Sequence, residues 1–279
     1  MNEAAVAIDE PARAVAGTGS LRFTRAGDRT VLHTARASSP LKLLTPNNHG
    51  DAAWVFVATF GGGLVDGDAI ALDVRVDDDA GALLGTQAST KVYRSERGSR
   101  QSLDADVGSR ALLVVVPDPV ACFGGARYTQ RNAVQLADEA SLVLVDAMTC
   151  GRAAHGERWK LARYETTTRV TRADRDVVRD ALLIDPSHGE LDARMGRCNS
   201  LATVVAVGPR ARPIVDRLLG ASVPLDRRAP LLCAASALGD DGAIARIAGD
   251  DVERVSHFVR DLLAPIDAIL GDDPFARKW

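Results

Sequence analysis

The stretch that decides the fold runs from Thr59 to Ser95 and reads TFGGGLVDGDAIALDVRVDDDAGALLGTQASTKVYRS. Its glycines (61–63 and 67) are followed by a segment, 70–76, in which apolar and polar residues alternate. That period of two is typical of a β-strand with one buried face. A dinucleotide-binding loop needs a helix after its glycines, and a Walker loop needs a lysine directly after one, which this chain lacks. The glycines therefore predict a tight backbone turn rather than a phosphate site.

The middle of the chain carries a weak internal repeat of strand pairs. Strands are predicted to begin at Leu72, Leu103 and Val134, which lie 31 residues apart, and each is followed by a polar turn and an apolar strand. One strand pair alone cannot bury its apolar face, whereas stacked pairs bury these faces against one another, as in β-helical or layered architectures. Together with the further strands, they predict an all-β-dominated fold of many short strands in layered, β-helix-like sheets. Those further strands are Trp54–Ala58, Arg163–Val170, Val177–Ile184, Leu201–Val207, Leu231–Ala235 and Ala243–Ile247.

Two helices are predicted in the C-terminal half. The first is Pro213–Leu219, with proline at its first position and Gly220 as its terminator. The second runs from about Asp251 to Leu263, and Pro265 ends or bends it. We expect its apolar stripe to pack on the β body or on a partner, with polar residues facing away. The stripe is Val252, Val255, Val259 and Leu262, and the polar residues are Arg254, His257 and Asp261.

Composition excludes several classes of protein. Of 279 residues, 46% are apolar, which is globular rather than disordered, and the net charge of −3 gives no general attraction to nucleic acid or membrane. The four cysteines are scattered, and neither a signal peptide nor an apolar run of ~20 residues is apparent, so a cytoplasmic location is expected. We predict a mobile tail over residues 1–18 and one β-rich domain over 19–279.

Basic residues are almost all arginine. Only Lys42, Lys91, Lys160 and Lys278 among the 34 basic residues are lysine. Coding bias explains this in a chain equally rich in alanine and aspartate, whereas arginine enrichment is also typical of partner surfaces. The sequence leaves both explanations open.

No catalytic or metal-binding motif is apparent. Cys150 and His155 are the nearest nucleophile–base pair, yet no nucleophile elbow or oxyanion loop surrounds them. The histidines and cysteines form no spacing of the kind that holds a metal tightly.

The central stretch resembles the urease accessory protein UreD family, called UreH in some species. The family pattern GG-[IL]-V-x-G-D, then T-x-x-[ST]-T-K-x-Y-[RK]-S, is matched within residues 62–68 and 86–95. Further matches lie at Gly151, Arg152, Gly156, Glu157 and Trp159, and at the terminal Arg277-Lys278-Trp279. The family usually has Pro-Pro where Thr59-Phe60 stand and glycine where Asp66 stands.

That resemblance implies a β-rich, non-enzymatic maturation factor. It would act as a nickel-insertion chaperone or scaffold that binds UreF directly, reaches the GTPase UreG through UreF, and joins both to the urease apoprotein. It would help deliver Ni²⁺ to the urease active site through an internal passage, with at most transient Ni²⁺ and no tightly bound cofactor. A homodimer within the complex is compatible with it, and no nucleic acid or membrane is implied. The motif residues assigned to a partner surface or the passage are Ser89, Thr90, Lys91, Tyr93, Arg94, Arg152 and Glu157.

Acids within apolar strands are the candidates for the passage. By strand parity, Asp146 shares the side of Leu142 and Leu144, and Asp180 that of Val178. Burying a carboxylate costs several kcal/mol unless it is paired or solvated, so each is either salt-bridged to an arginine or lines a wet interior. Carboxylate oxygens would hold Ni²⁺ more loosely than imidazole or thiolate. Asp68 and Ser89, inside the central motif, are further passage candidates.

Two alternatives remain open. The acids could instead serve a β-rich hydrolase or isomerase as general acid and base. The altered glycine turn is also compatible with a binding module that no longer serves urease.

Overall fold

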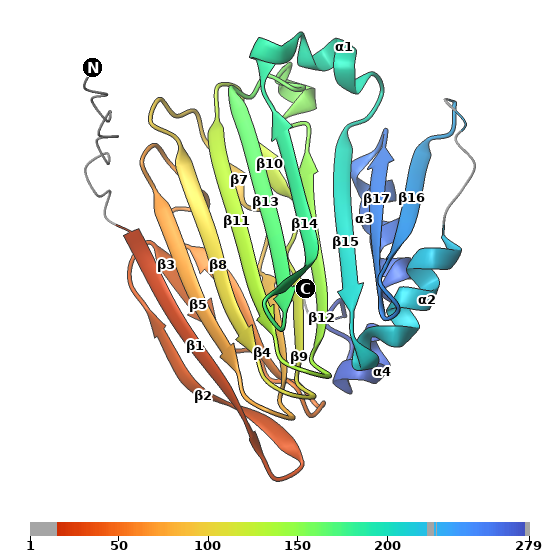
Figure 1. Cartoon of the computed structure of the whole chain (residues 1–279). Coiled ribbons are helices and arrows are strands. Elements are labelled where there is room, and N and C mark those ends of the chain that lie inside the picture. Colours follow the sequence, from red (N-terminus) through yellow and green to blue (C-terminus); the bar gives the residue numbers. More distant parts are fainter. Residues whose placement is uncertain (1–15, 222–225, 227, 277–279) are drawn as a thin grey trace, which may run out of the picture.

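Two β-sheets stack face to face, and helices cover the far side of the larger one (Figure 1). The computed structural model describes residues 16–221, 226 and 228–276. The smaller sheet has the order β14 (Arg175–Ile184), β13 (Arg163–Arg172), β11 (Arg127–Leu136), β8 (Ser99–Val107), β5 (Ala69–Val76), β1 (Ala16–Ala26), β2 (Arg29–Ala37). The larger has the order β16 (Leu231–Leu238), β17 (Gly242–Gly249), β15 (Ser200–Val207), β12 (Ser141–Thr149), β9 (Leu112–Val116), β6 (Gly81–Thr86), β4 (Ala53–Thr59), β3 (Leu41–Leu44). Beside β12, β10 (Val120–Cys122) pairs with β12 and with β7 (Lys91–Val92).

The chain winds between the two sheets, which confirms the layered, β-helix-like prediction. Each of β5, β8 and β11 lies in the smaller sheet, and the next long strand (β6, β9, β12) lies in the larger sheet. These strands pair in parallel within each set of three, and β12 pairs antiparallel with β15 on its other side. Leu72 pairs with Leu103, as the 31-residue spacing predicts, but Leu103 pairs with Asn132 rather than Val134. The difference of two residues keeps strand parity, so the predicted buried face is unchanged.

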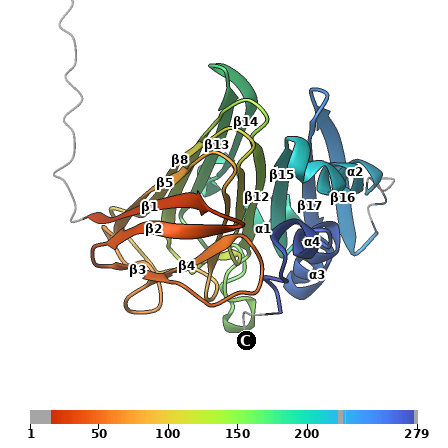
Figure 2. The ribbon, with the colours of Figure 1, turned by 90° about the horizontal axis from the view of Figure 1, so that it is seen from below.

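The two sheets differ in how they are buried, and their sequences reflect it. The smaller sheet has one exposed face, so β5 alternates buried Leu72 and Val74 with exposed Asp73 and Arg75. The middle of the larger sheet is covered on both faces, and its strands there are continuous apolar runs, as in β9, whereas β16 and β17 at one edge have exposed positions. One core lies between the sheets, and a second lies between the larger sheet and helices α2 (Arg212–Gly220), α3 (Val252–Leu262) and α4 (Ile266–Leu270) (Figure 2).

Both predicted helices are present, as α2 and α3. In α3, Val255, Val259 and Leu262 are buried in the second core, whereas Arg254, His257 and Asp261 are exposed. The Asp251 carboxylate accepts a hydrogen bond from the Arg254 N–H at the helix N-terminus. Three of the four predicted stripe residues therefore pack on the β body, whereas Val252 is only half-buried and lies outside this core. Two five-residue helices, α1 (Leu191–Met195) and α4, were not predicted, because one turn shows no periodicity.

All six further strands predicted from sequence are found, each within a longer element. They lie in β4, β13, β14, β15, β16 and β17. Strand β1 begins at Ala16, three residues before the domain start predicted at residue 19. Residues 1–15 of the predicted tail lie outside the described residues. The Arg277-Lys278-Trp279 motif lies outside them as well. Among the residues that the structure describes, no helix combines the length and apolarity needed to cross a bilayer.

Candidate functional site

A cavity of about 110 Å³ lies between the two sheets, and eight of its 20 lining residues are polar. The inward-facing positions of the smaller sheet change character along the strands. In β8, β11 and β13 they are polar toward the glycine turn and apolar toward the other end, as at Val134, Leu136 and Val170. In β5 they are apolar throughout. The strand register places three polar side chains in one row across the sheet: Gln101 of β8, Gln130 of β11 and Thr166 of β13.

Asp146 of β12 faces this polar row from the larger sheet. Its carboxylate accepts hydrogen bonds from the Thr166 hydroxyl at 2.5 Å and the Tyr164 hydroxyl at 3.3 Å. Burial raises the pKa of the Asp146 carboxyl, the hydroxyl hydrogen bonds act against that rise, and the nearby negative charge of Asp180 adds to it. The group therefore holds its proton to higher pH than an exposed aspartate does, and a divalent cation would compete with that proton.

Further hydrogen bonds fix side chains in and behind the cavity wall. Tyr128 donates to the Gln130 side chain at 2.8 Å, and burial raises the pKa of its hydroxyl well above the usual value, so that it remains a donor. On the side of β6, the Thr86 hydroxyl donates to the Asp118 carboxylate at 2.8 Å. Amide, hydroxyl and carboxyl oxygens thus occupy one part of the cavity wall, and the rest of the wall is apolar, as at Ile70, Leu84 and Leu144. Among the described residues, no three His, Cys, Asp or Glu side chains gather where they could hold a metal ion.

The three predicted acids do not share one surface. Asp146 lines the cavity. Asp180 forms an ion pair with Arg246 of β17, which is the salt-bridge alternative, yet it lies close enough to act on the pKa of Asp146. The Asp68 carboxylate accepts a hydrogen bond from the Val65 N–H of its own loop at 2.8 Å. Asp68 is not among the residues that line the cavity.

The motif residues divide between the cavity and the surface. Thr90 lines the cavity, whereas Ser89, Lys91 and Arg94 are exposed. The glycine turn itself is as tight as predicted: Gly61, Gly62 and Gly67 have positive φ, and a Cβ at Gly63 would lie 2.6 Å from the Lys91 carbonyl oxygen.

Residues from the two family motifs meet around Phe123. Tyr93 packs edge-on against its ring with centroids 5.3 Å apart, and the Arg152 guanidinium lies 4.2 Å from the ring centroid. Glu157 binds Arg152 through both carboxylate oxygens and also accepts the Gly124 N–H at 3.0 Å. The hydrogen bond with Arg152 lowers the pKa of Glu157 and raises that of Arg152. Arg152 and Glu157 therefore fix the loop that joins β10 to β11.

Gly151 gives a direct test of this arrangement. Its φ is +88°, and an added Cβ would lie 2.4 Å from the Cys122 carbonyl oxygen, so Gly151→Ala is expected to lower the free energy of unfolding by about 3 kcal/mol. Gly156→Ala is the matched control, because Gly156 also has positive φ but nothing within 4 Å of its Cβ position. Urea denaturation should show the larger loss for Gly151→Ala, and equal losses would exclude the clash.

Sequence reasoning missed the polar side chains that β11 and β13 turn toward the interior, of which Gln130 and Asn132 line the cavity. Tyr128, Gln130, Tyr164 and Thr166 occupy inward positions where strand alternation calls for apolar residues. That break in the alternation is the signal that could have found them.

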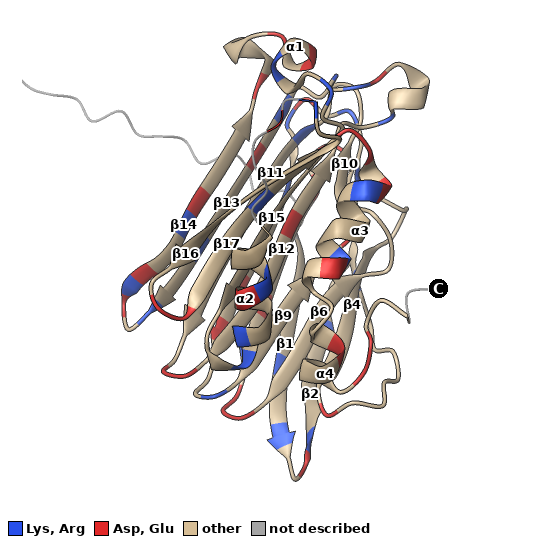
Figure 3. Cartoon of the chain, turned by 90° about the vertical axis from the view of Figure 1, so that its right-hand side faces the viewer, with Lys and Arg blue, Asp and Glu red and all other residues tan. Residues whose placement is uncertain are grey.

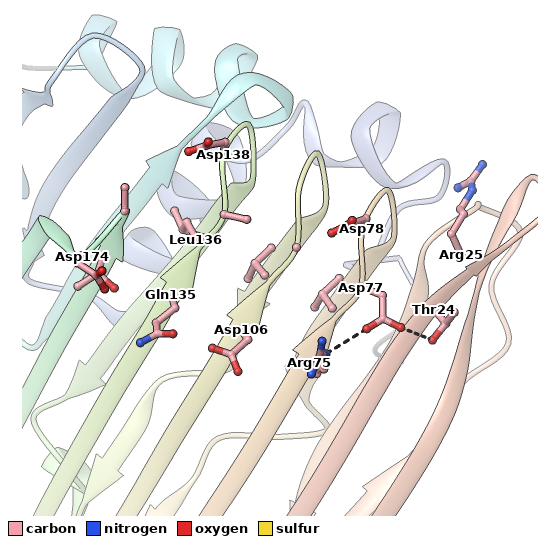
Figure 4. Close-up of a pocket in the computed structure, with 16 residues that line it drawn as sticks. Thr24, Arg25, Arg75, Asp77, Asp78, Asp106, Gln135, Leu136, Asp138 and Asp174 are labelled. Carbon is pink, nitrogen blue, oxygen red and sulfur yellow. Dashed lines mark hydrogen bonds and ion pairs between the residues drawn. The ribbon is translucent and has the colours of Figure 1, made fainter.

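A second depression, of about 930 Å³, lies open across the turns at the opposite end of the smaller sheet (Figure 4). Among the residues that line it, Asp77 accepts side-chain hydrogen bonds from Thr24, Arg75 and Arg22. These contacts neutralise Asp77 and fix the β5–β6 turn, so this surface is a weaker candidate than the cavity.

Similar proteins are found over almost the whole chain. The family model described as UreD urease accessory protein matches residues 15–279. A protein of Sorangium cellulosum named Urease accessory protein UreD is 58% identical over 264 residues, covering 95% of this chain and 85% of that protein. Urease accessory protein D of Oryza sativa subsp. japonica is 33% identical over 305 residues, covering 98% of this chain and 99% of that protein. The similarity therefore spans the cavity and the central motifs.

Proposed function

This chain belongs to the UreD family of urease accessory proteins, and we propose that it passes Ni²⁺ to apo-urease through the cavity between its two sheets. The observation that carries this proposal is the polar half of the interior around Asp146, Gln130 and Thr166. Polar groups between two sheets cost free energy, and an apolar core would be more stable there. Their presence in one continuous region fits a wet passage.

The chemistry of the wall suits a metal in transit. The cavity volume of about 110 Å³ is well above the ~15 Å³ that one water requires, so a partly hydrated cation fits. Oxygen ligands hold Ni²⁺ more weakly than imidazole or thiolate would, which allows release. Asp146 supplies the charged oxygen, and Gln101 and Gln130 supply neutral ones.

In this proposal the chain is a cytoplasmic scaffold without its own catalysis. It binds UreF, reaches UreG through UreF, and contacts apo-urease, so that GTP is hydrolysed by UreG. A hydrolase or isomerase site is less favoured, because small-molecule sites usually occupy ~300–1,000 Å³ and the cavity between the sheets is only about 110 Å³.

Co-expression tests the proposal. Urease, UreF and UreG are produced with and without this chain, and urease activity is measured in each lysate. Active urease is expected only when the chain is present, and the purified chain should hydrolyse neither GTP nor urea. Full urease activity without the chain would contradict the proposal, as would GTP turnover that a substitution in the glycine turn abolishes.

A further inference from the structure

Four loops meet at the end of the molecule that carries the glycine turn. The turn (60–67) hydrogen-bonds to the segment 91–98 through the Leu64 N–H and Lys91 carbonyl (2.8 Å) and the Tyr93 N–H and Leu64 carbonyl (2.9 Å). That segment in turn contacts 123–127, which is bonded to Lys160 through the Gly125 N–H (2.8 Å). We call this contiguous surface, made by 60–67, 91–98, 123–127 and 151–160, the glycine-turn end.

Two large apolar side chains stand out from the glycine-turn end. Phe60 is 58% exposed and Val65 is 53% exposed, the highest values for any large hydrophobic residue in the part of the chain that is described. Both lie in the turn whose glycines fix its backbone. Lys42 lies over the Phe60 ring, with its Nζ 5.8 Å from the centroid. Large apolar side chains exposed on one rigid turn, with charged residues nearby, are typical of a protein-binding site.

The same surface carries cations without internal partners. Lys91, Arg94, Arg127 and Lys160 are exposed, and none of them forms an ion pair with any described residue. The acids Asp66 and Glu157 are already bound to Arg97 and Arg152, which leaves Glu96 as a nearby exposed acid. Three of the four lysines of the chain therefore border this surface: Lys42, Lys91 and Lys160.

The opposite end of the molecule has the reverse character. Its turns carry Asp77, Asp78 and Asp79 after β5, Asp138 and Glu139 after β11, and Asp174 after β13, and acids mark these turns in Figure 3. Asp77 and Asp79 are paired with arginines there, whereas Asp138, Glu139 and Asp174 form no ion pair with the residues described, so the unpaired acids of this end contrast with the unpaired cations of the glycine-turn end. Such an asymmetry orients an approaching charged partner.

We propose that the glycine-turn end docks a partner protein whose surface presents an apolar pocket edged by carboxylates. Phe60 and Val65 fill the pocket, and Lys91, Arg94 and Lys160 pair with the carboxylates around it. An aromatic anchor with arginine around it is the usual composition of a binding hot spot. The inference rests on the proposed function, and it places the partner next to the cavity, because Lys91 directly follows the cavity-lining Thr90.

Binding measurements on the full chain test the docking surface. Two variants are compared with the wild type: Lys91→Glu with Arg94→Glu, and Phe60→Ser with Val65→Ser. The control is Arg175→Glu, an exposed arginine at the opposite end that forms no ion pair with the residues described. Purified UreF and purified apo-urease are the two probes, titrated separately at low and high salt.

Each double variant is expected to weaken binding of at least one probe by about tenfold or more, and the charge reversal should act more strongly at low salt. Arg175→Glu should leave both affinities within about twofold of the wild type. Because all the replaced side chains are exposed, thermal melting should remain unchanged, which separates lost docking from lost folding.

Wild-type affinity of both double variants for both probes overturns the docking surface. So does a wild-type chain that self-associates, or that binds RNA or anionic vesicles, through this surface while both probes bind the variants normally. If co-expression of the wild-type chain fails to activate urease, the proposed function falls, and this inference falls with it. If the wild type activates urease and both double variants bind UreF and apo-urease with wild-type affinity, only the proposed docking surface is wrong.

Discussion

Replacing Val255 by aspartate is expected to leave little folded protein. The side chain is 2% exposed in the core between the larger sheet and α3, and a Cβ added at Gly249 would lie 2.5 Å from its Cγ2. The new carboxylate would be buried without a partner, at a cost of about 3–5 kcal/mol, against a total stability of ~5–15 kcal/mol for a typical domain. The soluble fraction after expression and the urea midpoint measure the effect.

His257→Asp is the control for this substitution. His257 lies two residues further along the same helix and is exposed, so an aspartate at this position keeps its carboxylate in water. It should change stability by less than about 1 kcal/mol. If Val255→Asp is as soluble and as stable as His257→Asp, then α3 does not pack on the sheet as described.

The fold was predictable because its signals are local. Alternation identifies the smaller sheet, whose strands have one face in water, and unbroken apolar runs such as 112–116 identify the larger sheet. Helix α3 carries both its stripe and its N-terminal aspartate, Asp251. The register between β8 and β11 was not predictable, because a shift of two residues keeps the same face buried.

The site was predictable only in part. Strand parity correctly directed Asp146 inward, toward the cavity that it lines. The same reasoning directed Asp180 inward but could not find its partner Arg246, which lies 66 residues away in another sheet. For Asp68, the pattern gave no sign that the carboxylate closes its own turn by accepting the Val65 N–H. Long-range pairing and turn contacts are set by the fold, and no spacing in the sequence records them.

Replacing Asp146 by leucine is expected to abolish most urease activation while leaving the accessory complex intact. Leucine removes the charged oxygen from the cavity wall and fills part of a space of only about 110 Å³. The glycine-turn end, where a partner is proposed to dock, is untouched. Asp146→Asn keeps the shape and an acceptor for the Thr166 hydroxyl but loses the charge, so it separates the loss of a ligand from the narrowing of the route.

Asp73→Leu is the matched control. Asp73 is exposed on the outer face of β5, so the same substitution there leaves the interior unchanged. Urease activity with Asp73→Leu should equal that of the wild type. A purely structural role for Asp146 predicts a different pattern, in which Asp146→Leu loses solubility and UreF binding together with activation.

The nickel content of the urease produced distinguishes a passage through the cavity from a structural role of Asp146. Urease is purified from cells that express the wild type, Asp146→Leu, Asp146→Asn or Asp73→Leu, and nickel per active site is determined beside the yield of the complex with UreF. The account predicts normal complex formation in all four, normal nickel with the wild type and Asp73→Leu, and a severe loss of nickel with Asp146→Leu. Wild-type nickel loading by both Asp146 variants would contradict the passage and leave this carboxyl as part of the architecture.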